Sequence, residues 1–559
     1  FLMSGIDWAV LLGTLGLIVG YGTYMTRKSA GLAGYLKGGS DMKWLTIGLS
    51  VMATQASAIT FISTPGLAYE NGMEFIQNYF GLPIAILIVC VVFIPIYYRL
   101  KVYTAYEYLE QRFDVRIRLI TASLFMLSRG LAAGITIYAP AIIISVMLGW
   151  SLELTILLVG ILVIVYTVSG GTKAVSLTQK WQMTVILLGM GIAFGILLNR
   201  MPEEVSFLGA SDLAGASGRM NVVDFSFDFS KRYTFWSGIT GGLFLALSYF
   251  GTDQSQVQRY LSGKSIKESR LGLLFNALLK IPMQFMILLT GVLVFVFYQF
   301  EAHPVLFNKA AVQTAQESKY KAEFQDIENQ HQQFHKEKKA AYLDYAKQPT
   351  DAKKETLLAL DKKAKSVRDQ AREVVLKADP DQSSRDSDYV FLTFILNYLP
   401  QGLVGLLIAV IISAAMSSTA GEINALSSTT MVDFYQRFSK TEKSDTQSVN
   451  LSKWLTLGWG ILAIIFALSA QLVENLIEAV NILGSVFYGT ILGVFLTAFF
   501  LKKVGSRAVF TGIIVGQLTV SVLFYYEAVG YLWFNVIGCA IVMIVSYITS
   551  IFSSKPEQS

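Results

Sequence analysis

The sequence predicts an all-α protein that crosses a membrane about thirteen times. Hydrophobic residues make up 53% of its 559 residues and charged residues only 15%, whereas a soluble domain carries about 25% charged residues. A helix needs about 20 apolar residues to cross the hydrocarbon core of a bilayer. Thirteen runs meet this requirement, at about 8–26, 44–68, 75–98, 117–148, 152–170, 174–199, 234–252, 271–299, 390–431, 453–470, 475–500, 507–526 and 529–552.

Charge is concentrated in one segment, 301–388, which holds 16 Lys and Arg, 16 Asp and Glu and all three histidines. The apolar runs therefore contain no histidine, which excludes a histidine-based proton relay or zinc site within the membrane. A net charge of +6 diluted by apolar sequence argues against nucleic-acid binding. Cys90 and Cys539 both lie in apolar runs, so no disulfide framework or metal cluster is indicated.

The loops between the runs differ in charge, and this difference predicts the orientation in the membrane. Several Lys and Arg occur in each of the loops 27–43, 99–118, 253–270 and 501–507, whereas the alternate short loops have none. Short loops rich in Lys and Arg stay in the cytoplasm. We therefore expect a protein of the cell (inner) membrane with its N-terminus outside and its C-terminus in the cytoplasm.

The charged segment 301–388 then lies outside the cell. Its polar sequence predicts two helices, at about 308–347 and 351–377, with Thr350 or Asp351 as the N-cap of the second helix. Such a hairpin is either a solvated spacer or the docking site of a partner at the outer face.

Three apolar runs contain clusters of small and hydroxyl residues, at Ser50–Gly66, Tyr249–Gln254 and Ala414–Gly421. In a bilayer, unwound backbone is tolerated only where it is buried in protein or lines a polar cavity. The first two clusters are five runs apart. Interrupted helices at corresponding positions of two halves indicate an inverted-repeat transporter with its site at the middle of the membrane. The alternative is that small residues only allow the helices to pack closely.

The third cluster contains the adjacent serines Ser417 and Ser418. Hydroxyls and unwound carbonyls suit Na⁺, which is a hard cation and prefers oxygen ligands. Adjacent serines on a membrane helix more often donate to the carbonyl four residues earlier. The pattern alone leaves both alternatives open.

Four longer motifs follow one another along the chain: Tyr103–Phe113, Gly170–Val175, Gly251–Leu261 and Ser417–Tyr435. They resemble the sodium/solute symporter family, whose members carry sugars, sialic acids, vitamins, monocarboxylates and iodide with Na⁺. The resemblance covers the chain except for 301–388. It implies a LeuT-type fold, in which one leading helix precedes two inverted repeats of five helices and two trailing helices follow.

The resemblance also implies a division of the chain. The parts are a leading helix with a cytoplasmic loop (1–43), the first repeat (44–199), an extracellular loop (200–233), the first part of the second repeat (234–300), the charged hairpin insert (301–388), the rest of the second repeat (389–500), and the trailing helices with a short cytoplasmic tail (501–559).

One sodium site is implied by the resemblance. Its ligands are the backbone carbonyls of Ala53, Ala56 and Ala414 and the hydroxyls of Ser417 and Ser418. The lipid bilayer, the sodium ion and a small organic solute are therefore the expected partners.

A second sodium site, present in some family members, lacks its ligands here. Gln179 stands at the position of its aspartate, and Ala420 and Gly421 stand at the positions of its hydroxyls. The resemblance therefore implies one Na⁺ per cycle. Because Lys180 and Glu422 lie beside these positions, we expect a Lys180–Glu422 charge pair in place of the second ion. The alternative is that Lys180 reaches the cytoplasmic interface.

Ionisable residues within apolar runs are costly and mark functional sites. Here the positive ones are Arg129, Lys180 and Lys280, and the negative ones are Asp253 and Glu422. The small positive excess favours an anionic solute, and an arginine can bind a carboxylate through two hydrogen bonds.

Arg129 lies about one turn from the position that the resemblance to sialic-acid carriers implies for their carboxylate-binding arginine. Tyr249 matches the inner-gate tyrosine of the sugar carriers, but Ala246 replaces an asparagine of those carriers, and Tyr79 stands where they have a pocket glutamate. This puts neutral hexoses in doubt. The other residues expected around the solute are Gln55, Ser57, Thr60, Gln77, Tyr79, Lys280 and Asn481.

The sequence therefore predicts a sodium-coupled symporter and not an enzyme. It would import a small organic solute by alternating access, with one Na⁺ per cycle and a mild preference for a carboxylate-bearing solute such as sialic acid. The alternatives are a carrier of Na⁺ with a neutral sugar or polyol, and a solute sensor without transport. Gly263-Lys264-Ser265 resembles the end of a phosphate-binding loop, but the chain has Gln258 where that motif requires glycine.

Overall fold

The structure is a computed structural model that describes residues 4–26, 41–380, 386–439, 444–469 and 475–552. Within these ranges nine helices are long and apolar enough to cross a membrane, and one bent pair of helices would add a tenth span. Three shorter apolar helices accompany them, at Gly5–Leu17, Leu152–Val168 and Ser237–Gly251. The chain thus forms a multi-pass helical membrane protein, and the count of thirteen spans stays a prediction.

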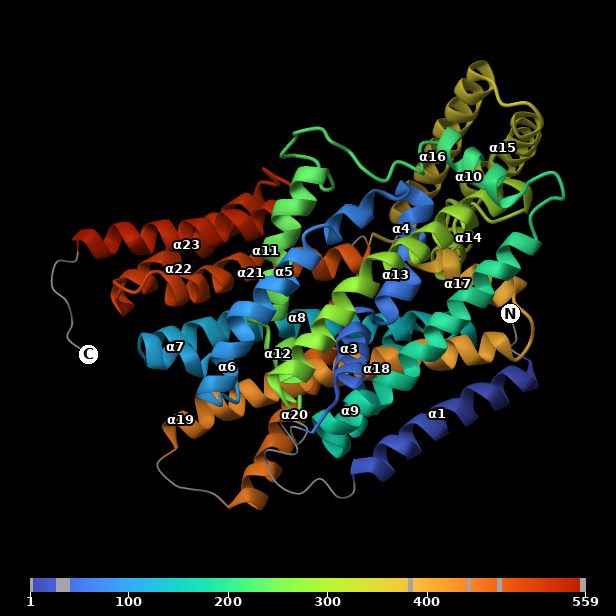
Figure 1. Ribbon diagram of the computed structural model, residues 1–559. Coiled ribbons are helices and arrows are strands. Elements are labelled where there is room, and N and C mark those ends of the chain that lie inside the picture. The colour runs from blue at the N-terminus through green and yellow to red at the C-terminus, as the bar shows by residue number, and fades with distance from the viewer. Residues whose placement is uncertain (1–3, 27–40, 381–385, 440–443, 470–474, 553–559) are drawn as a thin grey trace.

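The helices before the charged segment form the first half of the bundle (Figure 1). They are α1 (Gly5–Thr26), α3 (Trp44–Gln55), α4 (Ala58–Asn71), η1 (Glu74–Tyr79), α5 (Leu82–Ile88), η2 (Val89–Phe93), α6 (Ile94–Leu100), α7 (Glu107–Arg112), α8 (Val115–Leu148), α9 (Leu152–Asn199), α10 (Phe207–Ala216), η3 (Ser237–Gly241), α11 (Gly242–Gly251), α12 (Gln254–Leu261) and α13 (Ile266–Phe300).

Of the remaining helices, the first three lie in the charged segment and the others complete the bundle. They are α14 (Lys309–Glu317), α15 (Lys321–Lys347), α16 (Asp351–Ala378), α17 (Ser387–Tyr398), α18 (Leu403–Thr429), η4 (Thr430–Tyr435), α19 (Gln436–Phe438), α20 (Asp445–Ser469), α21 (Leu476–Phe500), α22 (Ser506–Tyr525) and α23 (Leu532–Phe552).

The second apolar run is broken between α3 and α4, as its small residues predict. Ala56 and Ser57 leave helical geometry, and the two helices meet at 53°. The break does not lie at Pro65, which is inside α4. Gly66 instead allows close packing, because a Cβ there would overlap the backbone carbonyl of Ser387 at the start of α17.

A second break separates α11 from α12, within the predicted cluster Tyr249–Gln254. Thr252 and Asp253 lie outside the helices, and the Asp253 carboxylate caps α12 by accepting from the Ser255 backbone N–H at 2.8 Å. The third cluster, Ala414–Gly421, is not a break, because α18 passes through it as continuous helix.

The predicted ninth run, 390–431, is wrong as a single helix. It forms α17 and α18, which are separated at residues 399–402. Pro400 cannot continue a hydrogen-bonded helix, and Gly402 adopts a left-handed φ of 83° that glycine tolerates best.

The predicted fifth and sixth runs, 152–170 and 174–199, are joined in one helix of 48 residues, α9. In a straight helix Tyr166 and Thr178 would be about 18 Å apart along the axis. Their hydroxyl oxygens lie 3.1 Å apart. The helix is therefore sharply bent between these residues, which leaves two apolar segments, as the sequence predicts.

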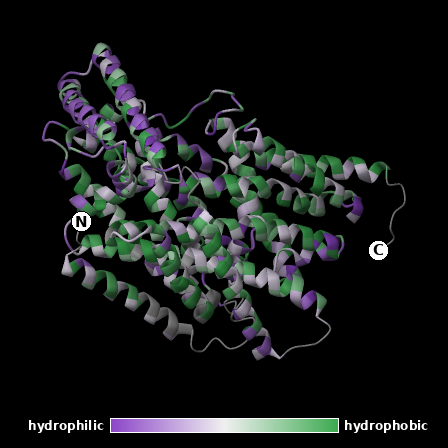
Figure 2. Cartoon of the chain, turned by 180° about the vertical axis from the view of Figure 1, so that it is seen from behind, coloured by the Kyte–Doolittle hydropathy of each residue, from purple (hydrophilic) through white to green (hydrophobic). Residues whose placement is uncertain are grey.

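The charged segment forms the predicted hairpin, with one more helix than expected. The first predicted helix is interrupted at Ser318, whose hydroxyl accepts from the Tyr320 backbone N–H at 3.0 Å. The second begins after Thr350, whose side chain caps it. Figure 1 shows α15 and α16 side by side at one end of the bundle, and Figure 2 shows their polar surface above the largely apolar helices.

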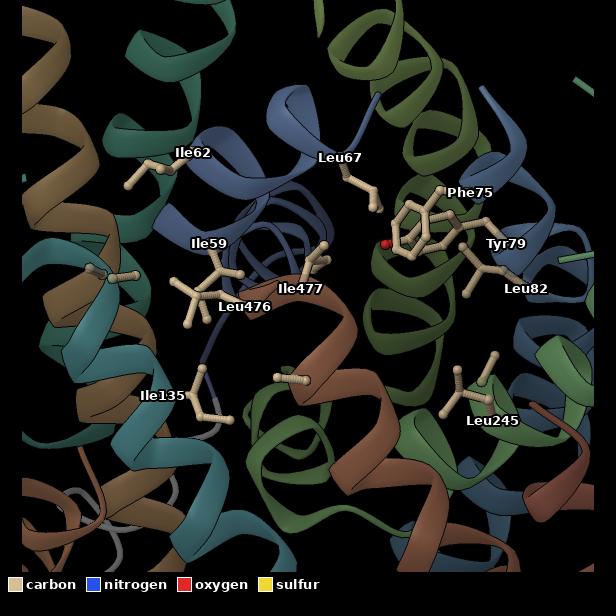
Figure 3. Packing of buried hydrophobic residues seen from close by; sticks show 14 of the residues in the cluster. Ile59, Ile62, Leu67, Phe75, Tyr79, Leu82, Ile135, Leu245, Leu476 and Ile477 are labelled. Atoms are coloured by element: carbon tan, nitrogen blue, oxygen red, sulfur yellow. The ribbon is translucent and has the colours of Figure 1, made fainter. Parts of the chain in front are cut away.

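The hydrophobic core of the bundle surrounds the broken helix. Figure 3 shows Ile59 of α4, Tyr79 of η1, Leu245 of α11 and Ile477 of α21 within one buried cluster. The consecutive elements α4 and η1 thus meet α11 and α21, which are far from them in sequence, beside the break between α3 and α4.

Candidate functional site

A pocket lies beside the break between α3 and α4. Of the residues predicted to bind solute or to form a gate, six line it: Gln55, Ser57, Tyr79, Arg129, Tyr249 and Asn481. Residues not predicted to bind solute complete the polar part of the wall: Thr54, Asn78, Thr136, Glu422 and Tyr488. The pocket thus joins residues of α3, α4, η1, α8, α11, α18 and α21.

Three predicted solute-binding residues do not line this pocket. Thr60 donates from its hydroxyl to the Gln55 carbonyl at 3.4 Å. Gln77 is tied to loop backbone, since its side chain accepts from the Asp224 N–H at 2.9 Å. Lys280 is fully buried behind the wall, with its ammonium 5.1 Å from the centroid of the Tyr79 ring and without a hydrogen-bond partner among the described residues.

Arg129 is the centre of a buried ion network. Its guanidinium donates to Glu422 of α18 at 3.0 Å and also bonds to Asp253 and Tyr488. The Tyr488 hydroxyl donates to Asp253 at 2.8 Å, and Thr136 donates to Glu422 at 2.9 Å. The guanidinium faces two carboxylates of the protein itself, so its charge is already compensated without the solute carboxylate that the sequence predicts as its partner.

Tyr249 separates the pocket from α12. Its ring centroid lies 5.5 Å from the Arg129 guanidinium carbon, and its hydroxyl accepts from the Gln256 amide at 2.6 Å. Its place at the edge of the pocket, one turn before the break, suits the role of a gate.

Three of the five predicted sodium ligands come together from two helices. Ala53 and Ala56 of α3 and its cap share one small buried cluster with Ala414 of α18. The last carbonyls of a helix have no partner within it; at the end of α3, Met52 accepts from the Ala56 N–H and Gln55 from Thr60, which leaves the carbonyls of Ala53 and Thr54 as the oxygens of the last turn for a hard cation. Ser418 donates to the Ala414 carbonyl at 2.9 Å, as the alternative interpretation expected, and the side chain of Ser417 lies outside the described part of the structure.

The predicted Lys180–Glu422 pair does not form. Glu422 is bonded to Arg129, whereas the Lys180 ammonium lies 5.3 Å from the centroid of the Trp181 ring. Trp181 is 54% exposed on the outside of the bundle. Lys180 therefore faces away from the interior, in line with the alternative that it reaches an interface. Its neighbour Gln179 points inward and accepts from Ser50 of α3 at 2.6 Å.

Arg259, which belongs to the predicted loop 253–270, is instead a buried cation beside Gly421. The side chain is 1% exposed and donates to Ser176 at 2.9 Å. A Cβ at position 421 would overlap the guanidinium. Among the described residues no carboxylate forms an ion pair with Arg259. Arg259 could have been predicted only if its segment had been interpreted as a helix whose polar face points into the protein, rather than as a loop.

Comparisons with known proteins decide the family. The model of the family "Sodium:solute symporter family" matches residues 35–322 and 378–516. The chain belongs to the sodium:solute symporter family. The unmatched interval contains most of α15 and all of α16 except its last residue, so the hairpin is an addition to the family's common helices.

Similar proteins include the sodium/sialic acid symporter SiaT of Proteus mirabilis (strain HI4320), 27% identical over 99% of this chain and 96% of that protein. The mouse sodium-coupled monocarboxylate transporter 2 is 26% identical over 94% of this chain and 72% of its own. The human sodium/iodide cotransporter is 34% identical over 49% of this chain, which spans 42% of that relative.

A solved structure of a sodium-coupled sialic acid symporter in a substrate-bound, outward-open state has the same fold. Its TM-score is 0.77 at 24% identity, and the match covers all of both chains. Family, relatives and fold agree that this symporter is a transporter of the membrane with Na⁺ as its coupling ion. The predicted family and coupling ion are thereby confirmed.

Proposed function

We propose that this family member imports a small polar solute that carries a carboxylate, such as a sialic acid, together with one Na⁺ per cycle. Similarity to the sialic acid symporter SiaT over almost the whole chain supports the solute class. The polar pocket at the helix break, lined by Gln55, Ser57 and Asn481, supports a solute with several hydrogen-bonding groups.

The observation that carries the proposal is that residues of the sodium cluster and residues of the solute pocket alternate along the chain at the break between α3 and α4. Ala53 and Ala56 belong to the cluster that would hold Na⁺, whereas Thr54, Gln55 and Ser57 line the pocket. An ion bound to carbonyls at the end of α3 would order the same backbone that presents the solute-binding side chains. Binding of one would therefore favour binding of the other, as coupling requires.

Lys280 supports a carboxylate on the solute. In the part of the chain that the structure describes, its buried ammonium has no hydrogen-bond partner, and isolated charges at membrane depth are costly unless they are compensated. The Tyr79 ring, which lines the pocket, lies 5.1 Å from the Lys280 ammonium. A change in the Tyr79 rotamer would allow the ammonium to reach a solute carboxylate.

A neutral sugar or polyol is the second candidate, and the Arg129 network favours it. Because Asp253 and Glu422 already compensate Arg129, the charge at that side of the pocket is balanced or slightly negative. The amide and hydroxyl groups of the wall would suit sugar hydroxyls equally well.

Arg259 supports a single Na⁺. Its guanidinium lies against Gly421 of α18. In relatives with a second sodium site, this turn of the helix would face the second ion. A fixed positive charge in a low-dielectric interior repels a cation strongly. Gln179, which replaces a carboxylate, cannot offset this charge.

The basic loops support an orientation with the hairpin outside the cell and the C-terminus in the cytoplasm. In this orientation α12 lies on the cytoplasmic side of the pocket, and Tyr249 is its inner gate. Import would proceed by rocking of one helix bundle against the other around the pocket.

Uptake into proteoliposomes under an imposed Na⁺ gradient tests the proposal. We expect sodium-stimulated uptake of N-acetylneuraminate, competition by other carboxylates, and weak competition by glucose. Lys280→Met should weaken uptake of the carboxylate solute at least tenfold. Uptake without sodium stimulation would refute symport, and stronger competition by neutral sugars would favour the second candidate.

A further inference from the structure

The hairpin encloses a cavity that is separate from the pocket. Its volume is about 360 Å³, and most of the residues that line it belong to α15 and α16 of the hairpin and to the ends of α4 and α13. Figure 1 shows these helices at one end of the bundle. Glu70, near the end of α4, lines it, whereas the pocket lies at the start of α4. Since α4 is 14 residues long, the two sites are about 20 Å apart.

Ion pairs hold the walls of this hairpin cavity in place. Arg372 of α16 donates to Glu70 at 2.6 Å, and Arg368 bonds to Asp386 at the start of α17. Lys338 of α15 lies 2.8 Å from Asp361 of α16. The cavity is therefore a built feature of the docked hairpin rather than a gap between loosely packed parts.

The lining of the hairpin cavity has an excess of positive charge. Six cationic side chains line it, against the three carboxylates of Glu70, Asp361 and Asp369; the cationic residues are Arg219, Lys338, Lys362, Lys365, Arg368 and Arg372. Lys362 and Lys365 form no ion pair with a described residue.

Unused hydrogen-bond donors accompany this charge. The Nε groups of Arg368 and Arg372 are buried and have no hydrogen-bond partner within the described ranges. His303, His331 and His335 line the same cavity, and the ring centroids of the last two lie 4.7 and 5.4 Å from that of His303. The described residues contain no group of three His, Cys, Asp or Glu arranged to hold a metal ion. Positive charge with free donors suits an anion instead.

We propose that the hairpin cavity is a second binding site, for a small anion that carries a carboxylate or a phosphate. The hairpin side of the cavity lies outside the family match, since that match stops at residue 322 and resumes at residue 378, whereas the ends of α4 and α13 lie within it. The site therefore forms where the added hairpin docks on helices that match the family model. Its ligand is either a free inorganic anion or the anionic solute itself on the outer side of the membrane.

Calorimetric titration of the full-length protein in detergent tests the site. The probes are inorganic phosphate and N-acetylneuraminate, each in choline buffer and in sodium buffer. Binding to the hairpin cavity should persist in choline, because its lining contains no residue of the sodium cluster. Phosphate and N-acetylneuraminate binding equally would indicate a general anion site, and selective binding of the latter would indicate the solute.

The variant Lys362→Glu/Lys365→Glu reverses two charges in the lining and should weaken binding in choline at least tenfold. The matched control Lys354→Glu/Lys363→Glu changes two exposed lysines of the same helix that do not line the cavity, and it should bind like the parent. No binding by the parent, equal losses in both variants, or binding that requires sodium would each overturn the proposal. A failure of sodium-driven uptake would not affect this result.

Discussion

Arg129 is the residue on which the buried polar network depends. Replacing it with glutamine would leave Asp253 and Glu422 buried without a counter-charge, which costs about 3–5 kcal/mol in comparable pairs. We expect Arg129→Gln to lower the midpoint of thermal unfolding and to abolish uptake. Arg116→Gln is the control, because Arg116 is 65% exposed and such pairs contribute about 1 kcal/mol or less. Similar midpoints for both variants would contradict the network's role.

Gly421 is a residue whose small size is needed by its neighbour Arg259. A Cβ there would displace the Arg259 guanidinium from a site where it has one hydrogen bond to Ser176. Gly421→Ala should therefore reduce uptake and thermal stability, although alanine favours helices over glycine. Gly458→Ala is the matched control, since a Cβ at Gly458 of α20 meets nothing within 4 Å. If both variants behave alike, Arg259 does not need the space beside Gly421.

At the scale of elements, the hairpin should loosen in acid. Burial and the nearby cations Arg368, His335 and Lys338 lower the pKa of His331 from 6.5 to about 4, while the His303 carbonyl opposes this shift. The docked hairpin therefore favours neutral His331. The contribution of neutral His331 to the stability of the docked hairpin is fully present above pH 6.5 and is lost as the pH falls from 6.5 towards 4.

Hydrogen exchange of α15 and α16 as a function of pH would measure this loss. We expect the rate of amide exchange through hairpin opening, corrected for the intrinsic exchange rate, to increase as the pH is lowered from 6.5 to 4. His331→Gln keeps a hydrogen-bond donor for the His303 carbonyl and should reduce the pH dependence. The pKa values of His303 and His335 are also lowered, mainly by burial, so some dependence should remain. An unchanged dependence in the variant would show that His331 is not responsible.

At the scale of the whole molecule, stoichiometry determines the response to voltage. One Na⁺ with a monoanionic solute moves no net charge, whereas one Na⁺ with a neutral solute gains about 2.3 kcal/mol from a potential of −100 mV. We expect accumulation of N-acetylneuraminate in proteoliposomes to be insensitive to an imposed potassium diffusion potential. Accumulation that rises with an inside-negative potential would instead indicate a second Na⁺ or a neutral solute.

Much of the architecture follows from local sequence because the bilayer makes local constraints strict. A membrane helix must satisfy its own backbone, so apolar runs predict spans and clusters of small polar residues predict the breaks at Ala56–Ser57 and Thr252–Asp253. The hairpin and its helix cap at Thr350 also follow from the local sequence. The division of α17 from α18 depends on Pro400 and Gly402, which a count of apolar residues overlooks.

The sequence by itself therefore determined the class, the family and two of the helix breaks, at Ala56–Ser57 and Thr252–Asp253. Only the tertiary structure decided which charges meet. Glu422 is 293 residues from Arg129, and its pairing with that residue rather than with Lys180 depends on which face of each helix points inward. The same is true of Arg259 beside Gly421 and of the lining of the hairpin cavity. Electrostatic pairing acts through space, so it becomes visible only when the packing of the helices is known.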